Sequence, residues 1–411
     1  MADRTARPHL VSGPATGVLI AGLAVALLVV SLVAISIGSV TLPVGAVWQV
    51  IGAHLTGRVD SVDPLREQVV WDIRRPRVLL AAVVGAGLSV AGVALQALVR
   101  NPLADPYVLG VSSGASLGAV LVAALGTTAL GGLGTAGAAF TTSLLSVLVV
   151  YLLAQRAGRL LDSRLVLAGV AVGYLCSAAT SYVQLQIDPS ELQRLMFWLM
   201  GSLAGGTWHD LGIPAAVMSV CVTYLLLQAR NLNALTTGDD AAAGLGVPVQ
   251  ALRIILLIVG SLLTATVVSV AGGIAFIGLM VPHMTRFIVG GDHRRVLPVA
   301  LLLGAVFLVL VDLASRTVDR PDELPIGIFT TALGVPFFLW LLRRRAGGNA
   351  WCGSRSQDCP RGSTPARSCP TSTWWPPAAS SSPSLAPTAA VSRRCCAPST
   401  GHSAPRPEPS A

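Results

Sequence analysis

The run from Leu252 to Gly272, LRIILLIVGSLLTATVVSVAG, contains one charged side chain, Arg253, close to its start. About 20 helical residues cross the hydrocarbon core of a bilayer, which is roughly 30 Å thick. Runs of this kind recur from Thr16 to Trp340, and 53% of the chain is hydrophobic while only 11% is charged. Soluble domains do not have this composition. The sequence therefore predicts an all-α fold, a polytopic helical bundle in a membrane.

The apolar runs and the polar breaks between them predict about ten spans. They are expected near 16–38, 78–98, 107–126, 131–154, 164–187, 210–228, 252–272, 274–289, 296–315 and 325–342. The first run is too long for the apolar region of a signal peptide and lacks a clear cleavage site, so it is predicted to be a retained span.

The positions of the arginines predict the orientation of the bundle. Lysine is absent, so every basic side chain is an arginine, and short cytoplasmic loops retain such charges. One side carries Arg4, Arg7, Arg100, Arg156, Arg159, Arg164, Arg230, Arg253, Arg286, Arg294, Arg295 and Arg343 to Arg345. This side is expected to be cytoplasmic, with both ends of the bundle and an N-terminal segment at residues 1–15.

Three ordered segments carry more specific information than generic apolar spans. They read RRPR (74–77), RNPLADP (100–106) and LGVSSGA (109–115); GDDAA (238–242) with LGV (245–247); and GGIAFIGLMVPH (272–283), DHRR (292–295), ELPIG (323–327) and GVPFF (334–338). In type and spacing they resemble the FecCD-type permease family, which includes importers of iron-siderophores, haem and cobalamin. The resemblance runs from about Gly17 to Arg345, and a permease domain is expected at 16–345.

The resemblance implies a permease subunit of a binding-protein-dependent ABC importer in the cytoplasmic (inner) membrane of a bacterium. In such a family two permeases pair, ATPase subunits bind underneath, and an extracytoplasmic substrate-binding protein delivers the substrate. An iron(III)-siderophore is the expected substrate, although haem and cobalamin remain open, as does the choice between a homodimer and a heterodimer. The chain itself is expected to be no enzyme and to bind no cofactor, since the partner ATPase uses ATP and Mg²⁺.

The second segment lies between two predicted spans on the arginine-rich side. In the family a Gly-Asp-x-x-Ala and Leu-Gly pattern forms short coupling helices that sit in clefts of the ATPases. The matching residues are Leu235, Gly238, Asp239, Asp240, Ala241, Ala242, Leu245 and Gly246. Leu235, Leu245 and Val247 offer apolar contacts, and the two aspartates suit a helix start. An ordinary amphipathic loop is the alternative.

Arginines also occur on the opposite, outer side, where the positive-inside rule does not explain them. By resemblance to the family, Arg74, Arg77 and Arg316 are expected to dock acidic residues of the binding protein. Arg75 adds a charge where the family commonly has an apolar residue. Charge pairing and snorkelling at span ends are the alternative for each of them.

Several polar or flexible residues are expected at membrane depth, where such groups face protein or a water-filled path. The candidates for the translocation path are Gln96, Asn101, Pro102, Gly110, Ser112, Ser113 and Gly114. Path lining and internal hydrogen bonding both remain open for them. His283 and His293 lack metal-ligand spacing and are expected to be structural, so no metal site is predicted.

Other functional classes fit the sequence less well. The net charge of +9 comes without a basic block, which argues against nucleic-acid binding. An ion-coupled secondary transporter would place acidic or lysine side chains inside its spans, but Asp312 near an outer end is almost the only candidate. A membrane enzyme would need a convergent acid-base or metal constellation, and none is visible.

Residues 346–411 have a different composition, rich in Pro, Ser, Arg and Cys, that cannot bury a core. A disordered tail is expected here. Read in the alternative frame, Ala386 to Cys396 permits a phosphate-binding loop of the Gly-x-x-x-x-Gly-Lys-Ser type. The hypothesis is an out-of-frame read-through into a downstream ATPase gene, which the nucleotide sequence would test.

Overall fold

The computed structural model describes residues 13–38, 42–57, 63–156, 158–320 and 322–346. The predicted segment at 1–15 lies almost wholly outside these residues, and the predicted tail does so from residue 347 onwards. Within the described part the chain is helical apart from one two-stranded hairpin of β1 (Gln155–Arg156) and β2 (Arg159–Leu160). The all-α prediction is confirmed.

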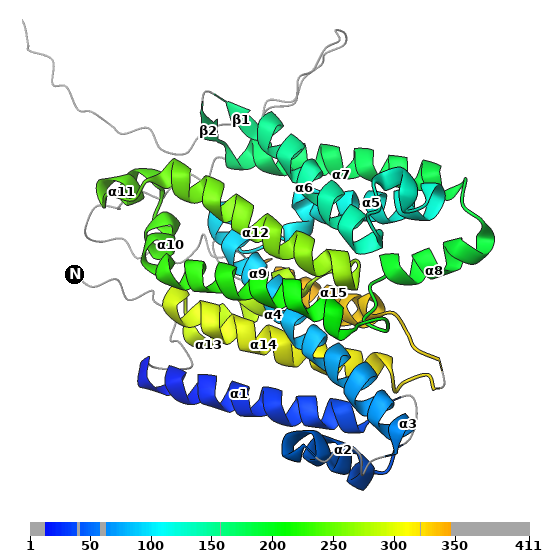
Figure 1. Cartoon of the computed structure of the whole chain (residues 1–411). Helices are drawn as coiled ribbons and strands as arrows, with labels where there is room; N and C mark the ends of the chain where they lie inside the picture. The colour runs from blue at the N-terminus through cyan, green and yellow to red at the C-terminus, as the bar shows by residue number, and fades with distance from the viewer. Residues whose placement is uncertain (1–12, 39–41, 58–62, 157, 321, 347–411) are drawn as a thin grey trace, which may run out of the picture. The chain divides into compact units, whose positions relative to one another are not determined.

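The helices follow one another along the chain as a series of long elements with short ones between them (Figure 1). The long helices are α1 (Gly13–Ser36), α4 (Arg75–Leu98), α6 (Thr135–Ala154), α7 (Asp162–Gln184), α9 (Trp208–Leu227), α12 (Val249–Ala271), α14 (His293–Ser315) and α15 (Ile326–Ala346). The shorter ones are α2 (Val44–Thr56), α3 (Pro64–Glu67), η2 (Gln68–Arg74), η3 (Pro106–Leu109), α5 (Val111–Leu125), η4 (Thr128–Leu130), α8 (Pro189–Leu199), α10 (Ala229–Thr236), α11 (Asp239–Gly244) and α13 (Ile277–Val289).

Among the described residues, eight helices are long and apolar enough to cross a membrane. Two further apolar helices, α5 and α13, are shorter, and together these ten helices correspond to the ten predicted spans. The short lengths have local causes. Pro106 starts the separate turn η3, and Gly110 follows it with a φ of 75°, so that α5 begins only at Val111.

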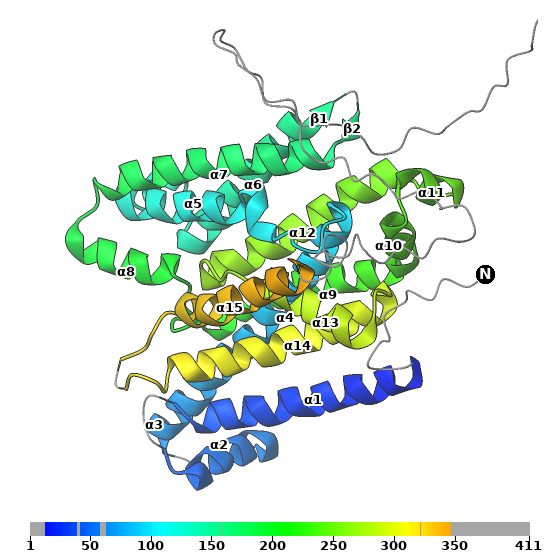
Figure 2. The same cartoon turned by 180° about the vertical axis from the view of Figure 1, so that it is seen from behind.

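Helix α4 forms the centre of the packing. It contacts α12, α13 and α14, and also α9 (Figures 1 and 2). From Val84 to Leu98 every residue of α4 is buried. Apolar attraction between helices is absent in lipid, so small residues that allow close backbone approach are the means of packing. Gly85 meets Gly304 of α14 in this way, and Gly92 meets Gly278 of α13.

The Gly92 contact gives a direct prediction. A Cβ atom at Gly92 would lie 1.9 Å from the carbonyl oxygen of Gly278, so Gly92→Ala forces the two backbones apart. We expect a loss of about 1–3 kcal/mol in the free energy of unfolding. Unfolding in mixed micelles with increasing SDS measures it. Gly22→Ala is the matched control, because no heavy atom lies within 4 Å of its added Cβ; equal stability of both variants would contradict the packing described here.

Candidate functional site

The predicted coupling segment, Leu235 to Gly246, covers the end of the short helix α10 and all of the short helix α11, at one end of α4. Gly238 lies between these two helices with a φ of 118°, which few other residues adopt. Leu235 and Ala242 are fully buried and hold these helices to the bundle. Leu245, in contrast, is 71% exposed. Of the apolar side chains predicted for a partner contact, only Leu245 is therefore presented outward, since Val247 is also buried. We call this region the Asp239 end.

The two aspartates of this segment differ. Both lie in the first turn of α11, where negative charge is favourable. Asp239 is half-buried and ion-paired within the chain, whereas Asp240 is exposed. A surface hollow of about 470 Å³ adjoins them, and Ala243, Val249 and Gln250 complete much of its lining. The segment thus combines an exposed apolar side chain, an exposed carboxylate and a recess.

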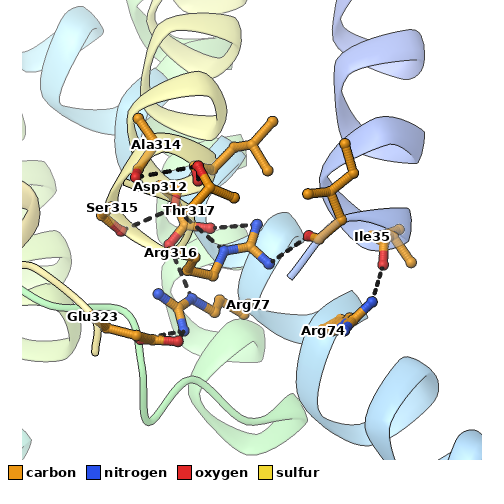
Figure 3. A network of polar contacts seen from close by, with 11 residues as sticks. Ile35, Arg74, Arg77, Asp312, Ala314, Ser315, Arg316, Thr317 and Glu323 are labelled. Atoms are coloured by element: carbon orange, nitrogen blue, oxygen red, sulfur yellow. Dashed lines mark hydrogen bonds and ion pairs between the residues drawn. The ribbon is translucent and has the colours of Figure 1, made fainter. Parts of the chain in front are cut away.

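The three arginines predicted to dock a binding protein lie at the other end of α4, which we call the Arg77 end. Their side chains are buried, with exposed fractions of 4% for Arg74, 6% for Arg77 and 2% for Arg316. Figure 3 shows how they lie between α14 and the end of α1. The docking role stays a prediction, and any partner carboxylate has to reach groups that already have partners in this chain.

A buried carboxylate organises this end. Asp312 of α14 is fully buried; its Oδ1 accepts a hydrogen bond from Arg77 Nε (2.9 Å), and its Oδ2 lies 3.0 Å from Arg316 Nη2. Arg77 also pairs with Glu323 at 2.8 Å. Arg74 donates to the carbonyl oxygens of Ile35 and Ser36, each at 3.1 Å. The network therefore ties α4, α14, the segment before α15 and the end of α1 together.

Arg75, the additional charge in this region, has an aromatic environment. Its guanidinium carbon lies 3.7 Å from the ring centroid of Trp71 and 5.0 Å from that of Trp208. Trp71 in turn stacks on His54 at 3.6 Å. Cation–π contacts stabilise an arginine without an acidic partner. This aromatic environment is not predicted above, although Trp71 and Arg75 are four residues apart, the spacing of neighbours on a helical surface.

Three of the seven predicted path residues, Gln96, Gly110 and Gly114, are packed inside the chain. Gln96 is 3% exposed; its Nε2 donates to the carbonyl oxygen of Gly278 (3.2 Å), and its Oε1 accepts from Arg286. Gln96 therefore makes internal hydrogen bonds, while its place in a path stays a prediction. Gly110 packs against α7 and Gly114 against Ser146 of α6.

The other path candidates lie nearer the surface. Asn101 is exposed, and its Oδ1 accepts from the backbone N–H of Leu103 at 3.0 Å. Pro102, Ser112 and Ser113 are half-buried. They belong to the segment that joins α4 to α5 and to the start of α5.

A second hollow, of about 520 Å³, was not anticipated from the sequence. It is lined mainly by small residues from the segment between α12 and α13 and from the start of α15, namely Gly273, Ala275, Gly327, Ile328, Thr331 and Ala332, together with Met200. The segments GGIAFIG and ELPIG contribute three of these residues, Gly273, Ala275 and Gly327. Their dense glycines are therefore a signal that could have indicated this hollow.

The histidines occupy packed positions. His283 is 7% exposed and packs edge-on against the rings of Phe287 and Phe337. His293 Nδ1 lies 2.7 Å from Asn233 Oδ1. Within the part of the chain that the structure describes, no group of three or more His, Cys, Asp or Glu side chains could hold a metal ion.

Comparison with known proteins gives a consistent result. The model of the FecCD transport family matches residues 26–344. An uncharacterized ABC transporter permease of Bacillus subtilis, YvrB, is 44% identical over 77% of this chain and 91% of that protein. The cobalamin import permease BtuC of Halobacterium salinarum is 43% identical over 69% of this chain and 76% of its own length. The hemin transport permease HmuU of Yersinia pestis is 42% identical over 67% of this chain and 84% of its own length.

A solved structure shows the same fold. It is described as an inward-facing conformation of a metal-chelate type ABC transporter, and it superposes with a TM-score of 0.70 at 31% identity. The match covers 80% of this chain and 99% of the other. The chain belongs to the FecCD transport family, as a membrane subunit of an ABC transporter in which a separate ATPase hydrolyses ATP.

Proposed function

We propose that this chain is the permease subunit of a binding-protein-dependent ABC importer that carries a metal chelate, an iron(III)-siderophore, across a bacterial cytoplasmic membrane. The observation that carries the proposal is the identity above 40% with permeases named for hemin and cobalamin import. The match to the iron(3+)-hydroxamate permease FhuB of Bacillus subtilis, 36% identical over 80% of this chain, supports the choice of iron.

In this proposal the Asp239 end faces the cytoplasm and binds the ATPase subunits. The exposed Leu245, the exposed Asp240 and the hollow beside them provide apolar, charged and recessed features for that contact. The Arg77 end faces outward and receives the substrate-binding protein, with Arg74, Arg77 and Arg316 directing it. Charges at such a site steer and orient docking more than they supply affinity.

We propose that a second permease, identical or related, completes the path. The hollow at Gly273, Gly327 and Thr331 supports this arrangement, because small residues of the segment before α13 and of the start of α15 leave an open wall that a partner can face. Asn101, Pro102, Ser112 and Ser113 remain candidates for a further part of the path. ATP binding would close the ATPases, and the Asp239 end would pass that movement to the spans.

Uptake into proteoliposomes tests the proposal. The permease, its ATPase and its binding protein are reconstituted together, and labelled ferric siderophore, haem and cobalamin are supplied separately. We expect uptake of the ferric siderophore that stops when ATP or the binding protein is omitted. If only haem or only cobalamin is taken up, that molecule replaces the siderophore as the proposed substrate. Uptake driven by an ion gradient without ATP would favour a secondary transporter.

Labelling tests the orientation. In a background without native cysteines, a cysteine at position 239 or 240 is expected to react with a membrane-impermeant maleimide in inside-out vesicles only. Asp240→Cys is the better reporter, because Asp240 is exposed. Reaction in right-side-out vesicles alone would reverse the proposed topology.

A further inference from the structure

Four charged side chains from distant parts of the chain meet at the Asp239 end. Arg100 follows the end of α4, Asp162 begins α7, Asp239 begins α11 and Arg253 lies in the first turns of α12. The group contains two positive and two negative charges. It is separate from the network around Asp312, which lies at the opposite end of α4.

The contacts form a closed ring. Arg253 Nη1 pairs with Asp162 Oδ1, and Arg253 Nη2 lies 3.0 Å from Asp239 Oδ1. Arg100 Nη2 lies 3.1 Å from Asp162 Oδ2, and Arg100 Nη1 lies 3.2 Å from Asp239 Oδ1. Each carboxylate therefore meets both guanidinium groups, and each guanidinium group meets both carboxylates.

The burial of Arg253 makes the ring important for the stability of this region. The side chain of Arg253 is 2% exposed, whereas those of Arg100, Asp162 and Asp239 are between 24% and 38% exposed. An isolated surface ion pair contributes little, but a buried charge that loses its partner is strongly destabilising. Arg253 consequently holds both carboxylates in place, and Asp239 cannot leave the ring without leaving Arg253 one partner short.

The ring connects the short helix α11 to the parts of the bundle that surround the predicted path. Arg100 directly precedes Asn101 and the segment that leads into η3 and α5. Asp162 is the first residue of α7, which packs against α5, α6 and η3. Short, directional ion pairs therefore couple the position of α11 to the start of α7 and to the segment after α4.

We propose that the ring of Arg100, Asp162, Asp239 and Arg253 is the joint that passes movement from α11 to α7 and to the segment following α4. This inference rests on the proposed function, in which the ATPase moves α11. In it, Asp239 is a positioning residue inside the permease and does not contact the ATPase, while its exposed neighbour Asp240 takes no part in the joint.

The test uses the complete reconstituted transporter and measures three quantities: ATPase co-purified with the permease, ATP hydrolysed, and substrate taken up. For Asp239→Asn we expect normal co-purification of the ATPase and normal ATP hydrolysis. The ratio of substrate taken up to ATP hydrolysed is expected to fall at least tenfold. Arg100→Gln leaves both carboxylates paired with the buried Arg253 and is expected to lower the same ratio at least threefold. Asp239→Glu keeps the charge and is expected to restore most of the ratio.

Asp188→Asn is the control, because it removes the same charge from an exposed aspartate that lies just before α8, outside the ring and outside the Asp239 end. It is expected to keep the ratio within twofold of the unmodified transporter. If Asp239→Asn and Asp188→Asn give equal ratios, or if uptake and hydrolysis fall together in Asp239→Asn and Arg100→Gln, the joint does not exist. Failure of the proposed function differs, because the unmodified transporter would then show no ATP-dependent uptake.

Discussion

Asp312→Ala is expected to lower the free energy of unfolding by about 3–5 kcal/mol, because it removes the carboxylate at the centre of a buried ion network. Asp312 is fully buried and lies within 3.0 Å of both Arg77 and Arg316. Without it, Arg316 retains no carboxylate within 4 Å among the described residues, although its side chain is only 3% exposed. Arg77 keeps Glu323 and is affected less.

Unfolding of the purified permease in mixed micelles with increasing SDS measures this loss. Asp322→Ala is the control, because Asp322 is exposed and close to the same region of the chain. It is expected to change the free energy of unfolding by no more than about 0.5 kcal/mol. If Asp312→Ala lowers the free energy of unfolding by less than about 1 kcal/mol, the side chains of Asp312, Arg77 and Arg316 are not desolvated as described.

Leu245→Arg is expected to reduce co-purification of the ATPase at least tenfold while leaving the permease folded. Leu245 is 71% exposed beside α11, so the substitution disturbs no packing within the chain. An apolar side chain at the centre of a protein interface contributes through its burial against the partner, and a guanidinium group there is costly to desolvate. Pull-down with tagged ATPase, together with the apparent melting temperature of the permease alone, separates the two effects.

The control for this prediction is Leu65→Arg. Leu65 is 72% exposed and lies in α3, which leads through η2 into the Arg77 end. We expect its variant to retain the ATPase fully. If both variants bind the ATPase equally well, Leu245 is not part of the contact; if Leu245→Arg also melts at a lower temperature, the loss belongs to the permease fold.

The spans could be predicted because their signal is local. The run at Leu252–Gly272 appears as α12, Val249–Ala271, with a shift of only a few residues at its start. The predicted span at 78–98 is longer in the structure, where α3, η2 and α4 form a continuous helical segment from Pro64 to Leu98. The charges of Arg74 and Arg75 concealed this extension, because two adjacent arginines are typical of a loop. In the structure Arg74 bonds to carbonyl oxygens of α1 and Arg75 lies on the ring of Trp71.

The partners of the buried polar and charged side chains could not be predicted from the sequence. Gln96 bonds to Gly278, which is 182 residues away, and Arg77 bonds to Asp312 at a separation of 235 residues. No periodicity or spacing encodes such pairs. The residue types of Gln96 and Arg77 therefore mark them as notable, but they do not determine whether Gln96 faces a path or the interior. The hollow at Gly273 and Gly327 was not predicted for the same reason, because it exists only once α15 lies beside the segment before α13.

The glycine contacts of α4 also limit how the bundle can rearrange. Gly85 and Gly92 each place bare backbone against a neighbouring helix, Gly304 in α14 and Gly278 in α13. Sliding α4 by about one helical turn along either neighbour would put a residue with a Cβ atom in the place of the glycine, against a carbonyl oxygen that now has room only for hydrogen. These three helices are therefore expected to travel as one rigid block, and any opening or closing of the transporter has to occur between that block and the helices around it.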